Sequence, residues 1–413
     1  MASRRRVAVI GAGAAGSMAA LFCTCADVET LLLERTPDGG RKILISGAGR
    51  CNVLPARSDE SRFVTDSSPH TLRKMLRSWP LPDQIRFFEA DLAIPLSEET
   101  ETGKLFPASN RARDVRDGLL ALARRRGVEF LAGTLVTGLE RGAGRWRILR
   151  EAAPPLEADA VVVATGGLSV PKSGSDGMGL SILERLGHTR HPTYAALTPL
   201  TAAPSPFTAL SGVSLPVALT ARGADRRAAA EGGFLFTHQR YSGPAVLDVS
   251  HVAVRSQADG GQPARLAVRW TRLDERGWEA ALSPQGSRTV AGALRVELPE
   301  RLAAALAAIA RVAPSRTLAQ LRREERLRLV ETLVRGDLPW SGHGGYEKAE
   351  VTGGGVSLAE VDPRTMESRK QPGLFLCGEL LDAFGPIGGY NFQWAWATGR
   401  AAGIGAAQRP PRP

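Results

Sequence analysis

The sequence predicts an α/β fold, a Rossmann-like dinucleotide-binding domain that is interrupted by a second, inserted domain. Three observations support this prediction. Gly11, Gly13 and Gly16 form a G-x-G-x-x-G pattern directly after the apolar strand 7–10. A second apolar strand, 30–33, ends in the acidic residue Glu34, eighteen residues after Gly16. A last apolar strand, 373–377, arrives only after a long segment of different composition.

Each glycine of the first turn has a mechanical role. The first permits a tight bend, the second lets a pyrophosphate approach the backbone, and the third lets helix and strand pack closely. The helix that continues through 17–22 directs free N–H groups and the positive end of its dipole at the phosphates. Glu34 is placed to accept hydrogen bonds from a ribose, and its charge disfavours a 2′-phosphate. A glycine-rich turn without a ligand is the alternative.

Length and composition indicate an ordinary water-soluble protein with two or three domains. The chain has 413 residues, of which 43% are hydrophobic and 23% charged. No apolar run is long enough to span a bilayer, and the glycine turn explains the N-terminal apolar stretch better than a secretory signal does. The cysteines lack the spacing of a metal site and are typical of a reducing compartment: Cys23, Cys25, Cys51 and Cys377. We therefore expect a cytoplasmic protein with no bound metal and no membrane span.

The charge balance is unusual. The formal net charge is +11 and the sequence pI is about 10.1, although only six residues are lysine. A biased genome composition explains a preference for arginine over lysine, but it does not explain an excess of basic over acidic residues. A basic surface that meets a polyanion therefore remains open.

The segment 38–52 is expected to be an anion-binding loop. It is rich in glycine and lacks the regular apolar spacing of a helix. The run 47–49 can form a concave row of N–H donors. Three basic residues add positive charge nearby: Arg41, Lys42 and Arg50. An ordinary basic surface loop is the alternative.

Beyond this loop, apolar spacing predicts alternating helices and strands. Helices are expected at 69–91 and 114–126, and strands at 128–131, 135–139, 146–149, 156–158 and 160–164. Prolines, glycines and short valine-bearing segments predict a β-rich region over 191–298, and helical spacing of leucine and alanine predicts helices over 299–335. The expected domains are therefore 1–190 together with 344–413, and an insert at 191–343 that forms the substrate side.

The order of these elements, with a strand that runs into Thr165, Gly166 and Gly167, resembles the two-dinucleotide-binding-domain flavoproteins. Only one fingerprint is present, so a separate NAD(P)H domain is not expected. More narrowly, the chain resembles the HI0933-like family, also called aminoacetone-oxidase-like NAD(P)/FAD-dependent oxidoreductases. The matching motifs lie at 40–52, 164–174, 235–238, 242–245, 353–357 and 388–395. Ala48 departs from the family pattern, in which glycine is more frequent.

The resemblance implies that FAD is bound non-covalently and that NAD(P)H is the transient reductant. Glu379 is expected near the ribityl chain or the pyrophosphate, and the helix after Gly389 is expected to stabilise negative charge on the reduced flavin. The residues expected to bind the cofactor are Gly11, Gly13, Ala14, Ala15, Gly16, Glu34, Arg35, Arg41, Lys42, Ser46, Gly47, Gly49, Arg50, Cys51, Asn52, Val136, Thr165, Gly166, Gly167, Gly378, Glu379, Gly388, Gly389, Tyr390 and Asn391.

Three residues are candidates for catalysis. Cys51 lies inside the expected cofactor loop, although an isolated cysteine is more often a small buried hydrophobe. His238 and Tyr241, in the insert, are candidates for supplying a proton where a substrate meets the flavin. A purely structural hydrogen-bonding role is the alternative for His238.

The resemblance implies a reductase that passes a hydride to an enone-like C=C bond while an acid protonates the neighbouring carbon. Three substrate classes are open: a uridine of ribosomal RNA, a steroid- or bile-acid-like enone, and a small amine of the aminoacetone type that is oxidised by oxygen. The basic charge favours RNA. A flavoprotein that senses redox state, or docks on RNA without turnover, is a further alternative. The residues expected to dock RNA cluster in the helical stretch 311–335: Arg322, Arg323, Arg326 and Arg328.

Overall fold

The computed structural model describes residues 4–142 and 144–408. The chain divides into two compact units. Unit 1 extends to Tyr194 and resumes at Val351, and unit 2 runs from Ala195 to Glu350. The boundaries expected from the sequence lie at 190/191 and 343/344.

Unit 1 is built on a five-stranded parallel sheet in the order β20-β10-β1-β2-β6. Its first strand contains an apolar run from Val7 to Val9 that is completely buried, as expected for a parallel sheet covered on both faces. The last strand to arrive in the chain joins this same sheet, with Val161 opposite Leu374. The predicted α/β fold is confirmed. The strands are β1 (Arg5–Ile10), β2 (Val28–Leu33), β6 (Glu129–Leu131), β10 (Ala160–Val163) and β20 (Leu374–Leu376).

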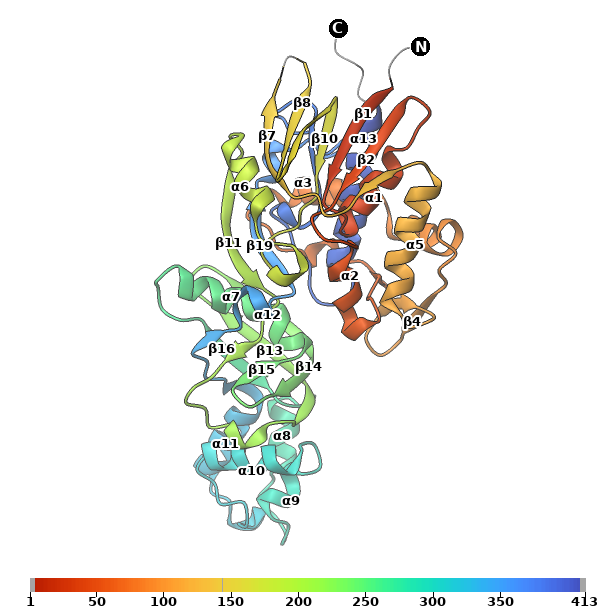
Figure 1. Ribbon diagram of the computed structural model, residues 1–413. Helices are drawn as coiled ribbons and strands as arrows, with labels where there is room; N and C mark the ends of the chain where they lie inside the picture. The colour runs from red at the N-terminus through yellow and green to blue at the C-terminus, as the bar shows by residue number, and fades with distance from the viewer. Residues whose placement is uncertain (1–3, 143, 409–413) are drawn as a thin grey trace. The chain divides into compact units, whose positions relative to one another are not determined.

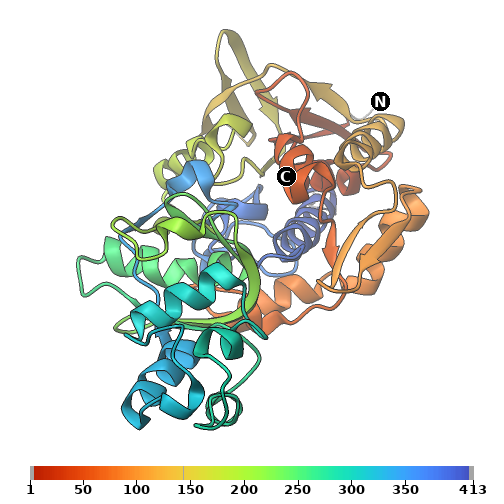
Figure 2. The same ribbon diagram turned by 90° about the horizontal axis from the view of Figure 1, so that it is seen from below.

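Two helices of unit 1 that are far apart in the sequence pack with their backbones in close contact. Helix α1 (Ala14–Cys23) lies beside α13 (Tyr390–Gln408) in Figures 1 and 2. A Cβ added to Gly399 would lie 2.3 Å from the carbonyl oxygen of Ala15, and a Cβ on Gly403 would lie 2.3 Å from that of Ala19. Only glycine permits this approach, which fixes the start of α13 relative to the first glycine turn.

The other helices of unit 1 are α2 (Arg41–Ile45), α3 (Pro69–Arg77), α4 (Leu81–Arg86), α5 (Ala112–Arg125) and α6 (Met178–Arg185). Unit 1 also contains three small sheets. The first consists of β3 (Leu54–Pro55), β5 (Lys104–Pro107) and β4 (Leu96–Glu99), and the second of β7 (Val136–Arg141), β8 (Trp146–Arg150) and β9 (Ala153–Ala158). The third pairs β11 (Arg190–Ala196) with β19 (Val351–Val356).

Unit 2 contains a seven-stranded sheet in the order β17-β16-β13-β14-β15-β12-β18. The helices at 275–335 gather at one end of this unit, drawn from teal to blue in Figure 1. The strands are β12 (Leu200–Thr201), β13 (Ser214–Arg222), β14 (Arg227–Phe236), β15 (Arg240–Ser242), β16 (Arg265–Arg269), β17 (Gly336–Asp337) and β18 (Gly342–His343). The helices are α7 (Pro244–Ala258), α8 (Glu275–Ala281), α9 (Val290–Leu294), α10 (Glu300–Ile309), α11 (Arg323–Arg335) and α12 (Gly345–Lys348).

The expectation of a β-rich region over 191–298 is wrong for α7, α8 and α9. Helix α7 packs against β13 and β14, and ten of its fifteen residues are buried. A helix that is apolar on most sides shows no polar face, so its valines were interpreted as strand residues. Gly243 and Pro244 mark its start, since proline is favoured in the first turn of a helix. In the part of the chain that the structure describes, no helix has the length and apolar character needed to cross a membrane.

Candidate cofactor site

The turn between β1 and α1 has the geometry of a phosphate-binding turn. Gly11 has φ +99°, and a Cβ at Gly16 would lie 1.8 Å from the carbonyl oxygen of Gly11. Gly13 differs, because a Cβ there would meet nothing within 4 Å. Gly11 and Gly16 are therefore required by packing, whereas Gly13 leaves space above the backbone at the N-terminus of α1. Ala14 and Ala15 form the first turn of that helix.

Glu34 follows β2 directly and organises the turn. Its carboxylate accepts hydrogen bonds from the Ala12 N–H (2.7 Å), the Thr36 N–H (2.8 Å) and the Thr36 hydroxyl (2.7 Å), and only 8% of the residue is exposed. An ionised carboxylate has about four acceptor positions. One position therefore remains for a ligand hydroxyl. Thr36 was not predicted from the sequence, because its only signal there is a hydroxyl group two residues after the acidic residue.

The segment 38–52 is not the loop that the sequence predicted. Residues 41–45 form α2, and a 3₁₀ turn follows at Ser46–Gly49, with Gly47 and Ala48 left-handed at φ 56° and 57°. A single five-residue turn is too short to produce a helical spacing signal. The side-chain oxygen of Asn52 is buried and has no hydrogen-bond partner among the described residues. Such an orphaned acceptor at the edge of the turn is suited to a ligand N–H or O–H.

The three basic residues of this segment are all paired with carboxylates. Arg41 pairs with Asp38 at 3.2 Å, and Arg50 pairs with Glu99 at 3.0 Å and lies 4.1 Å from the centroid of the Phe106 ring. These ion pairs are partly exposed to solvent, so the anion-binding role expected for the three residues stays a prediction. Ser46 donates to the Ile43 carbonyl at 2.8 Å, which closes the end of α2.

Lys42 and Glu379 form the centre of a polar network at the strand ends. The Glu379 carboxylate accepts from the Lys42 ammonium (2.5 Å), the Ser169 hydroxyl (2.5 Å) and the Thr352 N–H (3.0 Å). The Thr352 hydroxyl accepts from the Ser169 N–H at 3.0 Å. A Cβ at Gly167 would lie 2.4 Å from that hydroxyl oxygen. The network ties together the loops after β10 and β20, and sequence reasoning missed Ser169 and Thr352.

The turn before α13 presents a second open glycine. Gly388 has φ +120°, and a Cβ there would meet only the Lys104 side chain, at 3.9 Å. Gly389 is closely packed, because its Cβ would lie 2.3 Å from the carbonyl carbon of Leu54. The turn is therefore open at one glycine and directs the positive end of the α13 dipole toward that opening.

Several of the other expected cofactor residues of unit 1 have structural partners. Tyr390 donates to the Arg57 carbonyl at 3.2 Å, and Asn391 exchanges two hydrogen bonds of 2.9 Å with the backbone of Gly385. Arg35 pairs with Asp176. Two glycines are closely packed: a Cβ at Gly378 would lie 2.7 Å from the Ala15 Cβ, and a Cβ at Gly166 would lie 2.7 Å from the Ser175 hydroxyl oxygen. The Thr165 hydroxyl is buried without a described partner, and Val136 is buried in β7.

Cys51 is unsuited to the catalytic role considered for it. The residue is completely buried, and burial raises the pKa of its thiol to about 12. The reactive form of a cysteine is the thiolate. At neutral pH this thiol is therefore protonated and inaccessible, and Cys51 behaves as a core residue.

Thiol titration checks this assignment. Cys23, Cys51 and Cys377 are buried, and Cys25 is exposed. A thiol reagent at pH 8 should modify one cysteine per native chain and four per unfolded chain, because burial excludes the reagent and keeps the buried thiols protonated. The Cys25→Ser variant should show no reactive thiol in the native state. Rapid modification of Cys51 in native protein, detected by peptide mass spectrometry, would contradict the assignment.

His238 and Tyr241 belong to unit 2, whereas the cofactor candidates belong to unit 1. His238 is exposed in the turn between β14 and β15. Tyr241 is 2% exposed, its hydroxyl lies 3.1 Å from that of Ser205, and burial raises its pKa. Tyr241 therefore has a packing role, and a proton-donor role for either residue stays a prediction.

A further polar cluster of unit 1 escaped the sequence analysis. Asp382 is almost completely buried and accepts from the Ser67 N–H and the Ser67 hydroxyl, both at 2.8 Å. The same hydroxyl lies 3.3 Å from Nε2 of His191, which is partly exposed. These residues are more than a hundred positions apart in the chain, so no local pattern indicates them. Among the described residues, no group of three or more metal-ligating side chains occurs.

Comparison with known proteins shows a match over nearly the whole chain. Residues 5–405 match the family model described as the HI0933-like protein Rossmann domain. The chain is 30% identical over 416 residues to the 3-dehydro-bile acid delta(4,6)-reductase of Clostridium scindens, covering 98% of this chain and 100% of that protein. It is 32% identical over 397 residues to the ribosomal RNA dihydrouridine synthase of Escherichia coli, covering 94% and 95%. The two relatives are similar to this chain to nearly the same degree.

A solved structure supports the fold. The 3-ketosteroid delta1-dehydrogenase of Sterolibacterium denitrificans aligns with a TM-score of 0.53 at 13% identity, over 98% of this chain and 99% of that one. At this identity the likeness concerns architecture alone.

The residues present fit the FAD that this fold implies. Gly13 leaves room for a pyrophosphate, and Glu34 retains an acceptor position near it. The buried oxygen of Asn52 is without a described partner.

Proposed function

Because the chain belongs to the HI0933-like Rossmann-domain family, it is a FAD-dependent oxidoreductase, and we propose that it reduces a uridine of ribosomal RNA with NAD(P)H. The observation that carries the choice of substrate is the net charge of +11. A protein that binds RNA gains most of its affinity from contacts between basic side chains and phosphates. A free bile acid or amine requires no such excess of arginine.

FAD, when bound, supplies hydride chemistry at the electron-poor carbon of the uracil C5=C6 bond. The protein's part is to hold and orient the cofactor. Glu34 fixes the turn around Ala12 and offers its remaining acceptor position to the ribose. Glu379 fixes the loops beside it, and the N-terminus of α13 favours negative charge at the opening next to Gly388.

Reduction of a bile-acid-like enone is the second candidate, supported by the 30% identity to the Clostridium scindens reductase over its full length. Both reactions add two hydrogens across a C=C bond that is conjugated with a carbonyl. The same cofactor site therefore serves either, and the difference lies in what docks beside it.

Incubation of FAD-loaded protein with NADPH or NADH and with either deproteinised ribosomal RNA or a 3-oxo-4,6-diene steroid tests the two candidates. We expect nucleoside mass spectrometry to detect dihydrouridine in the RNA, with NAD(P)H consumed in step. FAD-depleted protein is the control and should form none. Turnover of the steroid without any dihydrouridine would overturn the RNA proposal, as would turnover of a small amine with oxygen alone.

A further inference from the structure

A row of three arginines crosses the sheet of unit 2. Arg222 of β13 is directly opposite Arg227 of β14 on one side and Arg265 of β16 on the other. All three residues are exposed. Directly opposed side chains on neighbouring strands have Cβ atoms about 4.5–5.5 Å apart, and like charges in that position destabilise a sheet. The row therefore costs stability unless an anion lies over it.

Most of this positive charge is not neutralised within the protein. Arg265 pairs with Asp337 at 2.6 Å, but both side chains are about two-thirds exposed, so the pair is weak. Arg222 and Arg227 form no ion pair with a described carboxylate. Their guanidinium groups are consequently available, and a planar guanidinium binds a phosphate with two parallel hydrogen bonds.

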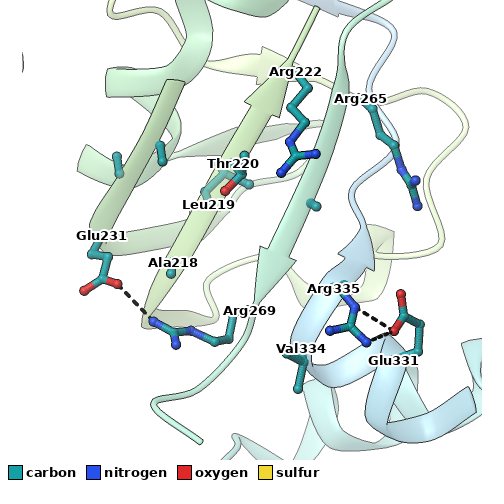
Figure 3. Close-up of a pocket in the computed structure, with 13 residues that line it drawn as sticks. Ala218, Leu219, Thr220, Arg222, Glu231, Arg265, Arg269, Glu331, Val334 and Arg335 are labelled. Atoms are coloured by element: carbon teal, nitrogen blue, oxygen red, sulfur yellow. Dashed lines mark hydrogen bonds and ion pairs between the residues drawn. The ribbon is translucent and has the colours of Figure 1, made fainter. Parts of the chain in front are cut away.

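Two members of the row, Arg222 and Arg265, line a groove of about 540 Å³ (Figure 3). The next row on the same face is small, with Thr220 between Ala229 and Ala267, so these three residues form a low floor. The row after that contains Glu231 and Arg269, which pair with each other at 3.0 Å. Arg269, deeper in the groove, is thus paired with a carboxylate, whereas Arg222 in the terminal row has no described carboxylate partner.

The lining argues against an apolar partner. The large hydrophobic side chains that are exposed in the described structure are Ile45, Leu235, Val296, Ile309 and Leu327, and none of them lines the groove. Six of the thirteen residues that line the groove are charged: Arg222, Glu231, Arg265, Arg269, Glu331 and Arg335. The chemistry favours a polyanion that lies along the sheet.

We propose that Arg222, Arg227 and Arg265 bind successive phosphates of the ribosomal RNA backbone, an inference that rests on the proposed RNA substrate. The three guanidinium groups originate one strand spacing apart, about 4.8 Å, on long side chains that can follow a phosphate backbone. We name these three residues the arginine row.

The arginine row suits this role better than the arginines predicted from sequence. Arg328 donates to the Ala310 carbonyl at 3.2 Å, and Glu325 accepts from the Arg322 N–H and pairs with Arg316. The Arg328 guanidinium is therefore occupied, and Glu324, Glu325 and Glu331 lie among the α11 arginines and dilute their positive charge. These arginines provide a matched control in the same unit.

Binding of deproteinised ribosomal RNA is measured by fluorescence anisotropy at several KCl concentrations, with full-length FAD-loaded protein. The test variant is Arg222→Gln/Arg227→Gln/Arg265→Gln, and the control, which removes equal charge, is Arg322→Gln/Arg323→Gln/Arg326→Gln. Each lost phosphate contact lowers the slope of log affinity against log salt by roughly one unit. We expect the test variant to lose about two to three units and the control to keep the wild-type slope.

Melting temperature and flavin absorbance establish that each variant is folded. Removing opposed like charges relieves repulsion, so the test variant should not melt below the wild type. The single variants Arg222→Gln and Arg222→Lys add a second measurement. The Arg222→Gln variant should lose about one unit of the salt slope of RNA binding, whereas Arg222→Lys should retain the wild-type slope because the positive charge is kept.

The outcomes separate the two proposals. If the test variant keeps the wild-type slope, or if the control variant loses slope instead, the arginine row does not bind the RNA phosphates. Neither result contradicts the proposal that ribosomal RNA is the substrate. Wild-type protein that shows neither salt-dependent RNA binding nor dihydrouridine formation would overturn the RNA substrate, and with it this inference. Binding of anionic vesicles in place of RNA would also overturn it.

Discussion

The Gly13→Ala variant should fold normally and bind FAD weakly. Gly13 has φ −77° and ψ −167°, which any residue adopts, and a Cβ there would meet no atom within 4 Å. The added methyl group instead occupies the space through which a pyrophosphate approaches the turn. Overfilling a close contact costs about 1–3 kcal/mol, so the dissociation constant of FAD should rise roughly 5- to 150-fold. Flavin content per chain and titration of the apoprotein with FAD measure the effect.

The neighbouring variant Gly16→Ala provides the contrast. Its Cβ would lie 1.8 Å from the Gly11 carbonyl oxygen, so the chain itself must distort. We expect a lower melting temperature for apo Gly16→Ala and an unchanged one for apo Gly13→Ala. Gly13→Ala protein that retains wild-type FAD affinity would show that no ligand approaches this turn.

The parts of the fold that were predictable are those with a local cause. The buried run Val7–Val9 and the glycine turn after it require no knowledge of distant residues, and the helix and strands around them follow from spacing. Helix α7 was missed because it is buried on most sides, and α2 because it is a single turn. The spacing of apolar residues reveals a helix only when a buried apolar face contrasts with an exposed polar face. Neither α7 nor α2 shows this contrast in its sequence.

The residues of the candidate site also divide into those that a local sequence pattern predicts and those that it does not. Gly13 and Glu34 were found because a fixed spacing connects them. Ser169 and Thr352 were not, since their contacts with Glu379 depend on how β10, β19 and β20 are arranged. Lys42 and Arg50 pair with Glu379 and Glu99, which are distant from them in the chain, so these partners are recognisable only in three dimensions. Asp38, only three residues from Arg41, was the one partner that sequence could have indicated.

Glu34→Ala should weaken FAD binding and destabilise unit 1 together. The substitution removes the acceptor for a ribose hydroxyl, and a hydrogen bond to a charged group contributes about 1.5–3 kcal/mol. FAD affinity should therefore fall on the order of 10- to 100-fold. It also leaves the N–H groups of Ala12 and Thr36 without their present acceptor, at about 1–3 kcal/mol for each one that stays buried. Isothermal titration of the apoprotein and thermal melting without FAD measure the two effects separately.

Glu29→Ala is the matched control, because it removes the same type of side chain from β2, the strand that Glu34 directly follows. Glu29 pairs with Arg6 at 2.9 Å, and its side chain is 37% exposed, so its loss should change stability by less than about 1 kcal/mol and leave FAD affinity unchanged. Glu34→Gln should fall between wild type and alanine, since the amide keeps one acceptor oxygen but loses the charge. If Glu34→Ala melts at a lower temperature but binds FAD as tightly as wild type, the carboxylate supports the turn and does not touch the ribose. If neither property changes, the hydrogen bonds that Glu34 makes to Ala12 and Thr36 do not hold the turn.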